Sequence, residues 1–238
     1  MKTKTSFPSI IMVIMFLPQV ILAQIVDILL VKDTSSSTLI EAPNFSGKKV
    51  LLSIIKPLDL MNSKYGVSFT VCTTGETGNP EYFTAELKPY NSWKTSKLDR
   101  YKDIKVFLSK SLNLITKISE KKNEERASNI YRNIHHIVHT GLKSKAEKRY
   151  VVIWSDFIES SGVDNWYTNY RNNPSDILTN YDKIVEKFET DLAWSKTPEN
   201  TEICLISRGY TEIGIMATRW WKKYLISKGI NTEIKASF

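Results

Sequence analysis

Short apolar runs without polar alternation recur along the chain and predict strands. Successive Val, Ile and Leu residues of this kind are typical of strands in a parallel sheet that are buried on both faces. These runs are Val26–Val31, Val67–Cys72, Tyr150–Trp154, Ile203–Ile206 and Thr232–Lys235. A further segment, Tyr82–Lys88, alternates more regularly between apolar and polar residues, and we expect it to form an edge hairpin strand.

Segments with apolar residues at helical spacing lie between these strands. In Asp103–Lys121 the apolar positions recur every three or four residues, and Glu212–Lys228 is followed by a glycine that favours a helix end. The other predicted helices are Lys49–Met61, Asn129–Leu142 and Asp176–Leu192. Because strands and helices alternate, the pattern predicts one α/β domain over residues 24–238. We expect a Rossmann-like three-layer sandwich, with a mostly parallel central sheet and helices on both faces.

The first 23 residues have a different pattern. A short basic start precedes the apolar run Ile10–Ala23, which is shorter than the roughly 20 residues of a membrane-spanning helix. This arrangement is typical of a secretory signal peptide, with cleavage after Ala23. An uncleaved anchor is the alternative, and Gln24 and Asp27 argue against it. We therefore expect the mature chain to be exported, either periplasmic or secreted, with no membrane span left after cleavage.

The charge of the chain adds little about partners. The sequence has 33 Lys and Arg against 25 Asp and Glu, a formal net charge of +8. The basic residues are interpreted as scattered pairs on solvated faces, without a long stripe. We therefore expect no nucleic-acid partner.

Small oxygen-bearing side chains crowd the end of the first predicted strand. Residues 33–37 read DTSSS, Asp156 follows another apolar strand, and Ser128 precedes a predicted helix. In an open parallel sheet, ligands bind outside the carboxyl ends of the strands. Carboxylates and hydroxyls that meet there are hard oxygen ligands of the kind that suits Mg²⁺. The plainer interpretations are a helix N-cap for the serines and a strand-end cap for Asp156.

Residues 26–38, VDILLVKDTSSST, resemble the first strand and loop of a von Willebrand factor A domain. That family carries Asp-x-Ser-x-Ser there, and Asp33, Ser35 and Ser37 match it. Ser128 resembles the Thr of the family's second loop, and Asp156 resembles the Asp of its third. The resemblance implies a metal-ion-dependent adhesion site of these five residues, which holds Mg²⁺, or Mn²⁺ or Ca²⁺. It also implies a protein partner whose acidic residue completes the coordination of the cation.

Three positions depart from the family pattern. Lys32 replaces an apolar residue, Ser36 stands where the family has Gly, and Ser155-Asp156-Phe157 lacks the usual Thr-Asp-Gly. The first hypothesis, which follows from the resemblance, is an exported, non-enzymatic binding module. The alternatives are a structural or assembly protein with a degenerate, metal-free site, and a metal-dependent phosphatase-like hydrolase. Such a hydrolase needs a second carboxylate two residues after the first, and this chain has Ser35 at that position.

Aromatic residues supply a possible rim for partner binding. Trp166 and Tyr167 lie in the predicted loop Ser160–Asn173, after Asp156, and we expect them to border the metal site. In the last helix, Trp220-Trp221 is expected to place one ring on the sheet and the other partly in solvent.

Histidines and cysteines are not expected to form a second site. His135, His136 and His139 share one predicted helix but lack the Glu of an HExxH motif, so we interpret them as a solvated face. In the strand order that the resemblance implies, two strands separate Cys72 from Cys204. This gap is about 14 Å, whereas a disulfide needs Cα atoms within about 7 Å. We therefore predict two free, buried thiols.

Overall fold

The structure is a computed structural model. It describes residues 25–38, 45–63, 65–74, 80–122, 125–142 and 146–237. The predicted signal peptide, residues 1–23, lies outside the described residues.

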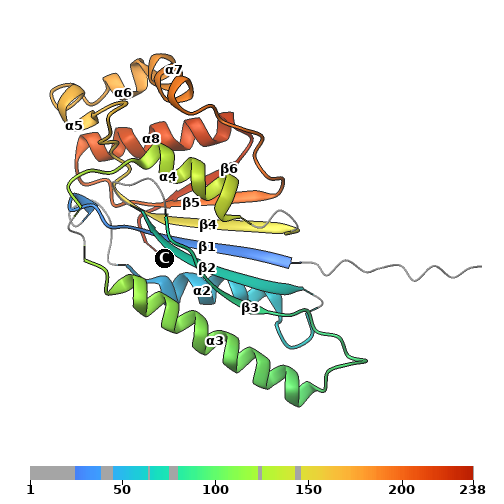
Figure 1. The fold of residues 1–238 in the computed structure, drawn as a ribbon. Coiled ribbons are helices and arrows are strands. Elements are labelled where there is room, and N and C mark those ends of the chain that lie inside the picture. The colour runs from blue at the N-terminus through green and yellow to red at the C-terminus, as the bar shows by residue number, and fades with distance from the viewer. Residues whose placement is uncertain are drawn as a thin grey trace, which may run out of the picture.

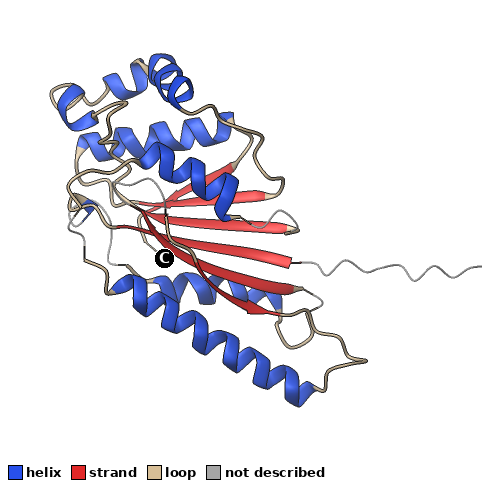
Figure 2. Ribbon diagram, viewed as in Figure 1, coloured by secondary structure: helices blue, strands red, loops and turns tan. Residues whose placement is uncertain are grey.

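Six strands form one central sheet (Figure 1, Figure 2). Their order is β3-β2-β1-β4-β5-β6, and every neighbouring pair is parallel except β2 with β3. The strands are β1 (Ile25–Asp33), β2 (Gly66–Thr74), β3 (Phe83–Leu87), β4 (Lys148–Trp154), β5 (Thr201–Ile206) and β6 (Asn231–Lys235). The predicted α/β sandwich with a mostly parallel sheet is confirmed, as is the edge position of β3, and β1 lies in the middle of the sheet.

Helices cover both faces of the sheet (Figure 1). One face carries α2 (Gly47–Ile55), the short 3₁₀ helix η1 (Lys56–Leu58) that continues it, and α3 (Lys97–Ser119). The other face carries α4 (Ile130–His136), its π-helical continuation η2 (Ile137–Gly141), and α8 (Glu212–Ser227). A further layer outside α8 consists of α5 (Trp166–Asn169), α6 (Asp176–Thr179) and α7 (Tyr181–Asp191).

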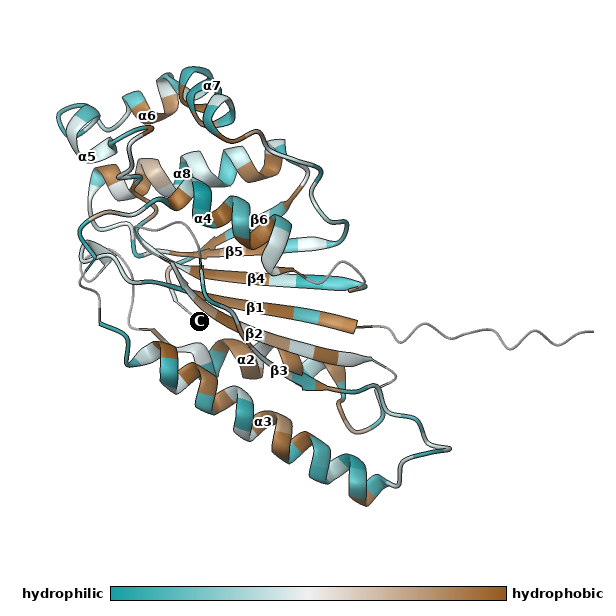
Figure 3. Ribbon diagram, viewed as in Figure 1, coloured by the Kyte–Doolittle hydropathy of each residue, from teal (hydrophilic) through white to brown (hydrophobic). Residues whose placement is uncertain are grey.

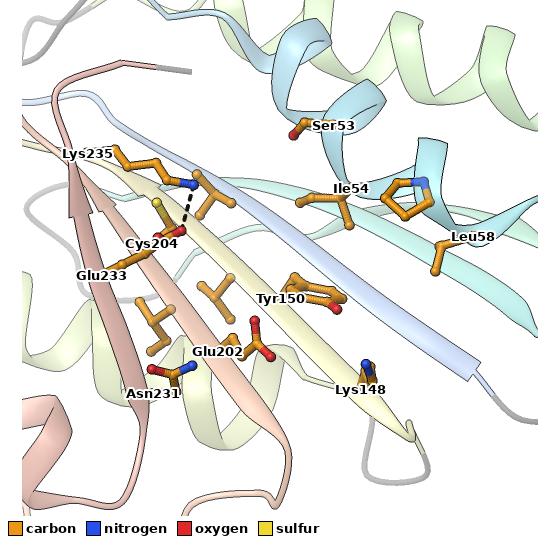
Figure 4. Close-up of a pocket in the computed structure, with 14 residues that line it drawn as sticks. Ser53, Ile54, Leu58, Lys148, Tyr150, Glu202, Cys204, Asn231, Glu233 and Lys235 are labelled. Carbon is orange, nitrogen blue, oxygen red and sulfur yellow. Dashed lines mark ion pairs between the residues drawn. The ribbon is translucent and has the colours of Figure 1, made fainter.

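The strands separate two apolar cores, because successive residues of a strand face opposite sides of the sheet. Leu29 and Val31 pack with the α4 and α8 side, whereas Ile28 and Leu30 pack with the α2 and α3 side. Figure 3 shows the apolar stretches along the central strands. On the α2 side, β4, β5 and β6 border a hollow of about 580 Å³ that is lined by both polar and apolar residues (Figure 4).

Lys32 follows this alternation and points away from Asp33. Its Nζ donates to the carbonyl oxygens of Ser119, at 3.2 Å, and Lys121, at 2.5 Å. These carbonyls lie at the C-terminal end of α3, where a helix favours a cation. The ammonium group of Lys32 therefore lies on the α3 side of the sheet.

Both tryptophans of α8 are buried, so the expectation that one is partly exposed is wrong. Trp221 Nε1 donates to the carbonyl oxygen of Phe157 at 3.0 Å. The ring of Trp220 lies 5.4 Å from that of Trp166 and 5.6 Å from that of Phe188, centroid to centroid. The outer layer of α5 to α7 therefore covers the side of α8 that would otherwise face solvent.

Cys72 and Cys204 are free and buried, as predicted. Cys72 lies on β2 and Cys204 on β5, and β1 and β4 run between these strands. The strand order thus keeps the two sulfurs apart.

Candidate functional site

The five predicted site residues meet at the carboxyl ends of β1 and β4. Ser128 Oγ donates to Asp33 Oδ2 over 3.3 Å, and the hydroxyl oxygens of Ser35 and Ser37 lie 3.3 Å apart. The Ser37 hydroxyl in turn bonds to the carboxylate of Asp156. Loops that are far apart in the sequence therefore bring these oxygens into one cluster, which we call the hydroxyl–carboxylate cluster.

The backbone fixes the two carboxylates in the same way. Asp33 Oδ1 accepts a hydrogen bond from the amide of Ser35 at 2.8 Å, and Asp156 Oδ1 accepts one from Ile158 at 3.0 Å. Such bonds to the amide two residues ahead are typical of Asx turns. Each turn holds one oxygen of its carboxylate on the backbone and leaves the other directed to the cluster.

Ser155 contributes a contact that the sequence analysis missed. Its Oγ donates to Asp33 Oδ2 at 2.6 Å and accepts the amide proton of Phe157 at 2.9 Å. The only sequence signal is its place immediately before Asp156, at the end of β4. Asp33 therefore receives more protein hydrogen bonds than the motif alone predicts.

Burial dominates the electrostatics of the cluster. Asp33 and Asp156 are both almost completely buried. Burial raises the pKa of Asp33, and hydrogen bonds from Ser155, Ser35 and Ser128 oppose this shift. Burial, together with the nearby charge of Asp33, raises the pKa of Asp156 to about 7. Because two buried carboxylates disfavour each other's ionisation, a proton or a cation is needed to balance the pair.

The donor set fits a hard cation. Carboxylate and hydroxyl oxygens are ligands of Mg²⁺, Mn²⁺ and Ca²⁺, whereas softer metals favour Cys and His. Within the residues that the structure describes, no group of three or more His, Cys, Asp or Glu side chains could hold a metal. The cluster has only two carboxylates, so any cation there would depend on hydroxyl oxygens and water for its other ligands.

The two residues of the predicted aromatic rim lie in different environments. Trp166 is fully buried, packed edge-on against Trp220, so its assignment to a partner-binding rim is wrong. Its ring fills the space between α8 and the outer helices. Tyr167 is 36% exposed, and its hydroxyl donates to Asp156 Oδ2 at 3.1 Å. A hollow of about 490 Å³ opens beside the cluster and is lined in part by Ser37, Tyr167 and Arg171.

Glu159 is a second buried acid that the sequence analysis did not find. Its Oε2 accepts the amide proton of Tyr131, at the start of α4, at 2.9 Å. Burial raises its pKa to about 8, and the nearby charge of Asp164 acts in the same direction. Nothing in the local sequence FIES marks it, because its burial results from packing of the loop against α4.

The histidines are partly buried, so their interpretation as a solvated face is wrong. His135 Nε2 lies 3.1 Å from the carbonyl oxygen of Ala193, and His139 Nδ1 lies 3.0 Å from Ser195 Oγ. Trp194 packs edge-on against both rings. These contacts join α4 and η2 to the segment after α7.

The chain matches no model of a known protein family and no curated protein with which it was compared. In the described parts of the chain, no helix combines the length and the apolar character needed to cross a membrane.

Proposed function

We propose that the chain is an exported binding module of the von Willebrand factor A type that grips a protein partner through a Mg²⁺-type cation. The observation that carries the proposal is the meeting of Asp33, Ser35, Ser37, Ser128 and Asp156 in one cluster, whose two carboxylates are buried. A bound cation would supply an open coordination position for an acidic side chain of the partner. The proposal includes no catalytic residue and no nucleic-acid partner.

Each side chain has a distinct part in this proposal. Asp33 and Asp156 balance the charge of the cation, and their Asx turns keep them in place. Ser35, Ser37 and Ser128 provide neutral oxygens, which lets the cation keep enough net charge to attract a carboxylate. Tyr167 lies at the surface and orients Asp156 through its hydroxyl.

A second candidate function is structural or assembly-related, with a degenerate site that holds no metal. The observation in its favour is the dense hydrogen bonding of Asp33. Ser155 Oγ is only 2.6 Å from Oδ2, and the Ser35 amide already occupies Oδ1. A carboxylate that is satisfied by the protein gains less from a cation. A phosphatase-like hydrolase is the weaker alternative, because Ser35 stands where a second carboxylate would be needed.

Titration with Mg²⁺ and Mn²⁺ distinguishes these functions. A ligand at one hundred times its Kd stabilises the folded state by about 2.7 kcal/mol, which thermal unfolding detects readily. We expect this stabilisation in the wild type and not in Asp33→Ala. Asp182→Asn, which changes an exposed carboxylate on α7, is the matched control and should respond like the wild type. Absence of any response in the wild type would favour the degenerate site.

Partner capture tests the second half of the proposal. An immobilised chain that starts at Gln24 should retain its partner in Mg²⁺ and release it when a chelator is added. Asp33→Ala should not retain the same protein under either condition. A partner that binds equally with and without chelator, and equally to Asp33→Ala, would argue for an assembly role that does not use the cluster.

A further inference from the structure

Exposed apolar side chains gather around the start of α3, far from the hydroxyl–carboxylate cluster. Trp93 is 96% exposed, Leu98 63% and Tyr101 47%. Trp93 sits in a defined turn, where its amide donates to Asn91 Oδ1 at 3.0 Å. The ring is therefore presented to solvent by an ordered backbone, although a tryptophan ring gains stability by leaving water.

Positive charge gathers in the same region. Residues 88–105, which lead to and begin α3, contain six Lys and Arg and two Asp and Glu, so six minus two gives a net charge of +4. The basic residues are thus less scattered than the sequence analysis assumed. Arg100 points inward and donates to the carbonyl oxygen of Leu60 at 2.7 Å, so its role is structural. Exposed lysines near Trp93 are Lys94, Lys97, Lys102 and Lys105.

The position of these lysines does not favour the stability of the helix. Lys97 is the first residue of α3, and Lys94 lies in the turn before it. The N-terminus of a helix carries a partial positive charge and favours acidic side chains, of which the first turn has only Asp99. An anionic surface outside the molecule would explain both the charges and their location.

The start of α3 lies near the amino end of β1, at the end of the sheet opposite to the one where β1 finishes with Asp33 (Figure 1). A small hollow there is lined by Ile25, the first residue of β1, together with Lys88 and Pro89. The amino end of β1 therefore lies beside the segment that leads to Trp93. The exposed rings and the lysines thus share the end of the molecule that lies opposite to the hydroxyl–carboxylate cluster.

We propose that this end of the molecule binds the surface of an anionic phospholipid bilayer. The binding surface, which we call the basic aromatic platform, consists of Trp93, Lys94, Lys97, Leu98, Tyr101 and Lys102. Aromatic rings occupy the interface between headgroups and acyl chains, and lysines attract anionic headgroups. Docking in this orientation directs the hydroxyl–carboxylate cluster away from the membrane, toward a partner.

Vesicle sedimentation tests the platform without the apolar run. Every described helix and strand, and both cores, lie within residues 25–237, so a chain that starts at Gln24 retains the fold. We expect it to sediment with vesicles of equal parts phosphatidylcholine and phosphatidylglycerol but not with phosphatidylcholine alone. Binding should weaken as salt is added, because exposed charges are screened. Equal binding to both vesicle types, or binding to neither, would overturn the proposal.

Charge reversal separates binding from folding. Lys94→Glu with Lys97→Glu should lower the partition coefficient on anionic vesicles at least about tenfold. The same change should leave the melting temperature equal or higher, since it places acids at the N-terminus of α3. Lys183→Glu with Lys196→Glu alters two exposed lysines elsewhere by the same net charge and should retain most of the binding. An equal loss in this control would mean that net charge alone drives adsorption, against the platform.

The contribution of Trp93 can be measured separately from that of the lysines. Trp93→Ala removes a side chain that supports no core, so the fold should be unaffected. Binding should weaken severalfold, and the blue shift of tryptophan emission on anionic vesicles should be lost. A shift that persists in Trp93→Ala would contradict insertion of this ring. Binding of the wild type to polyglutamate but not to vesicles would assign the surface to an acidic protein instead.

Discussion

Two environments for buried acids lie three residues apart in the loop after β4. Asp156 faces Asp33 and the serines of the hydroxyl–carboxylate cluster, whereas Glu159 faces the start of α4. Burial raises the pKa of both acids, Asp156 to about 7 and Glu159 to about 8. The two differ in their neighbours: Asp156 lies beside the buried carboxylate of Asp33, whereas Glu159 bonds to the amide of Tyr131 at the start of α4.

This difference in neighbours separates the roles of the two acids. Glu159 caps an amide at the start of α4. Asp33 and Asp156 are two buried carboxylates that disfavour each other's ionisation, and in the proposed function a cation balances their charge. The same degree of burial thus supports a structural role at one acid and a proposed binding role at the other.

The pH dependence of stability should give the largest separation between the two environments. In metal-free protein, Asp156 has a folded pKa near 7 against an ordinary 3.8, so the folded state holds more protons between these values. Stability must then fall as pH rises from about 4 to about 7, by up to about 4 kcal/mol. Glu159 adds a fall of the same sign that extends to about pH 8. Asp33, whose pKa burial also raises, contributes a fall of the same sign. Urea unfolding across this range measures the sum.

Two variants separate the contributions of the individual acids to this loss of stability: Asp156→Asn and Glu159→Gln. Asp156→Asn should remove the part of the fall that ends near pH 7. Saturating Mg²⁺ should also reduce this part in the wild type, because a cation favours the ionised carboxylate. The part due to Glu159 should persist in Mg²⁺ and disappear in Glu159→Gln. If Mg²⁺ leaves the whole profile unchanged, the pair is not a cation site.

Truncation of Glu159 should have the next largest effect. It should lower the stability of the fold and leave the response to Mg²⁺ unchanged. Glu159→Ala leaves the buried amide of Tyr131 without its acceptor, which costs about 1–3 kcal/mol. Glu159→Gln keeps an acceptor oxygen and should cost less. Both variants should respond to Mg²⁺ like the wild type in thermal unfolding. Loss of the Mg²⁺ response in Glu159→Gln would mean that the two environments are not independent.

The hydroxyl of Ser128 provides a finer test. Its hydrogen bond to Asp33 is long, at 3.3 Å, so we expect Ser128→Ala to cost the metal-free protein no more than about 1 kcal/mol. The same variant should bind Mg²⁺ about tenfold more weakly by calorimetry, as is typical when a metal site loses an oxygen partner. Ser128→Thr keeps the hydroxyl and should retain most of the affinity. Equal losses in Ala and Thr variants would assign the effect to packing.

The buried strands and the carboxylates that follow them could be predicted because their signals are local, whereas the strand order was predicted from the family resemblance. The apolar runs of β1, β2 and β4 mark buried strands, and Asp33 and Asp156 each follow one directly. The burial of Trp166 could not be predicted in this way. Its segment is rich in Asn, Tyr and Gly and resembles a loop, and its burial depends on contact with Trp220, far along the chain. Glu159 was missed for the same reason, since its partner on α4 precedes it by a strand and a loop.

Lys32 gives the smallest expected effect and tests whether the two faces of the sheet are electrostatically separate. The ammonium group is next to Asp33 in sequence but binds carbonyl oxygens at the C-terminal end of α3. Lys32→Met should therefore cost about 1 kcal/mol of stability through the lost hydrogen bonds and helix-end charge. Its Mg²⁺ affinity should stay within about twofold of the wild type, because the charge points to the opposite side of the sheet. A tenfold rise in affinity would show that this charge acts through the sheet on the cluster, and that the departure from the family pattern at this position weakens the site.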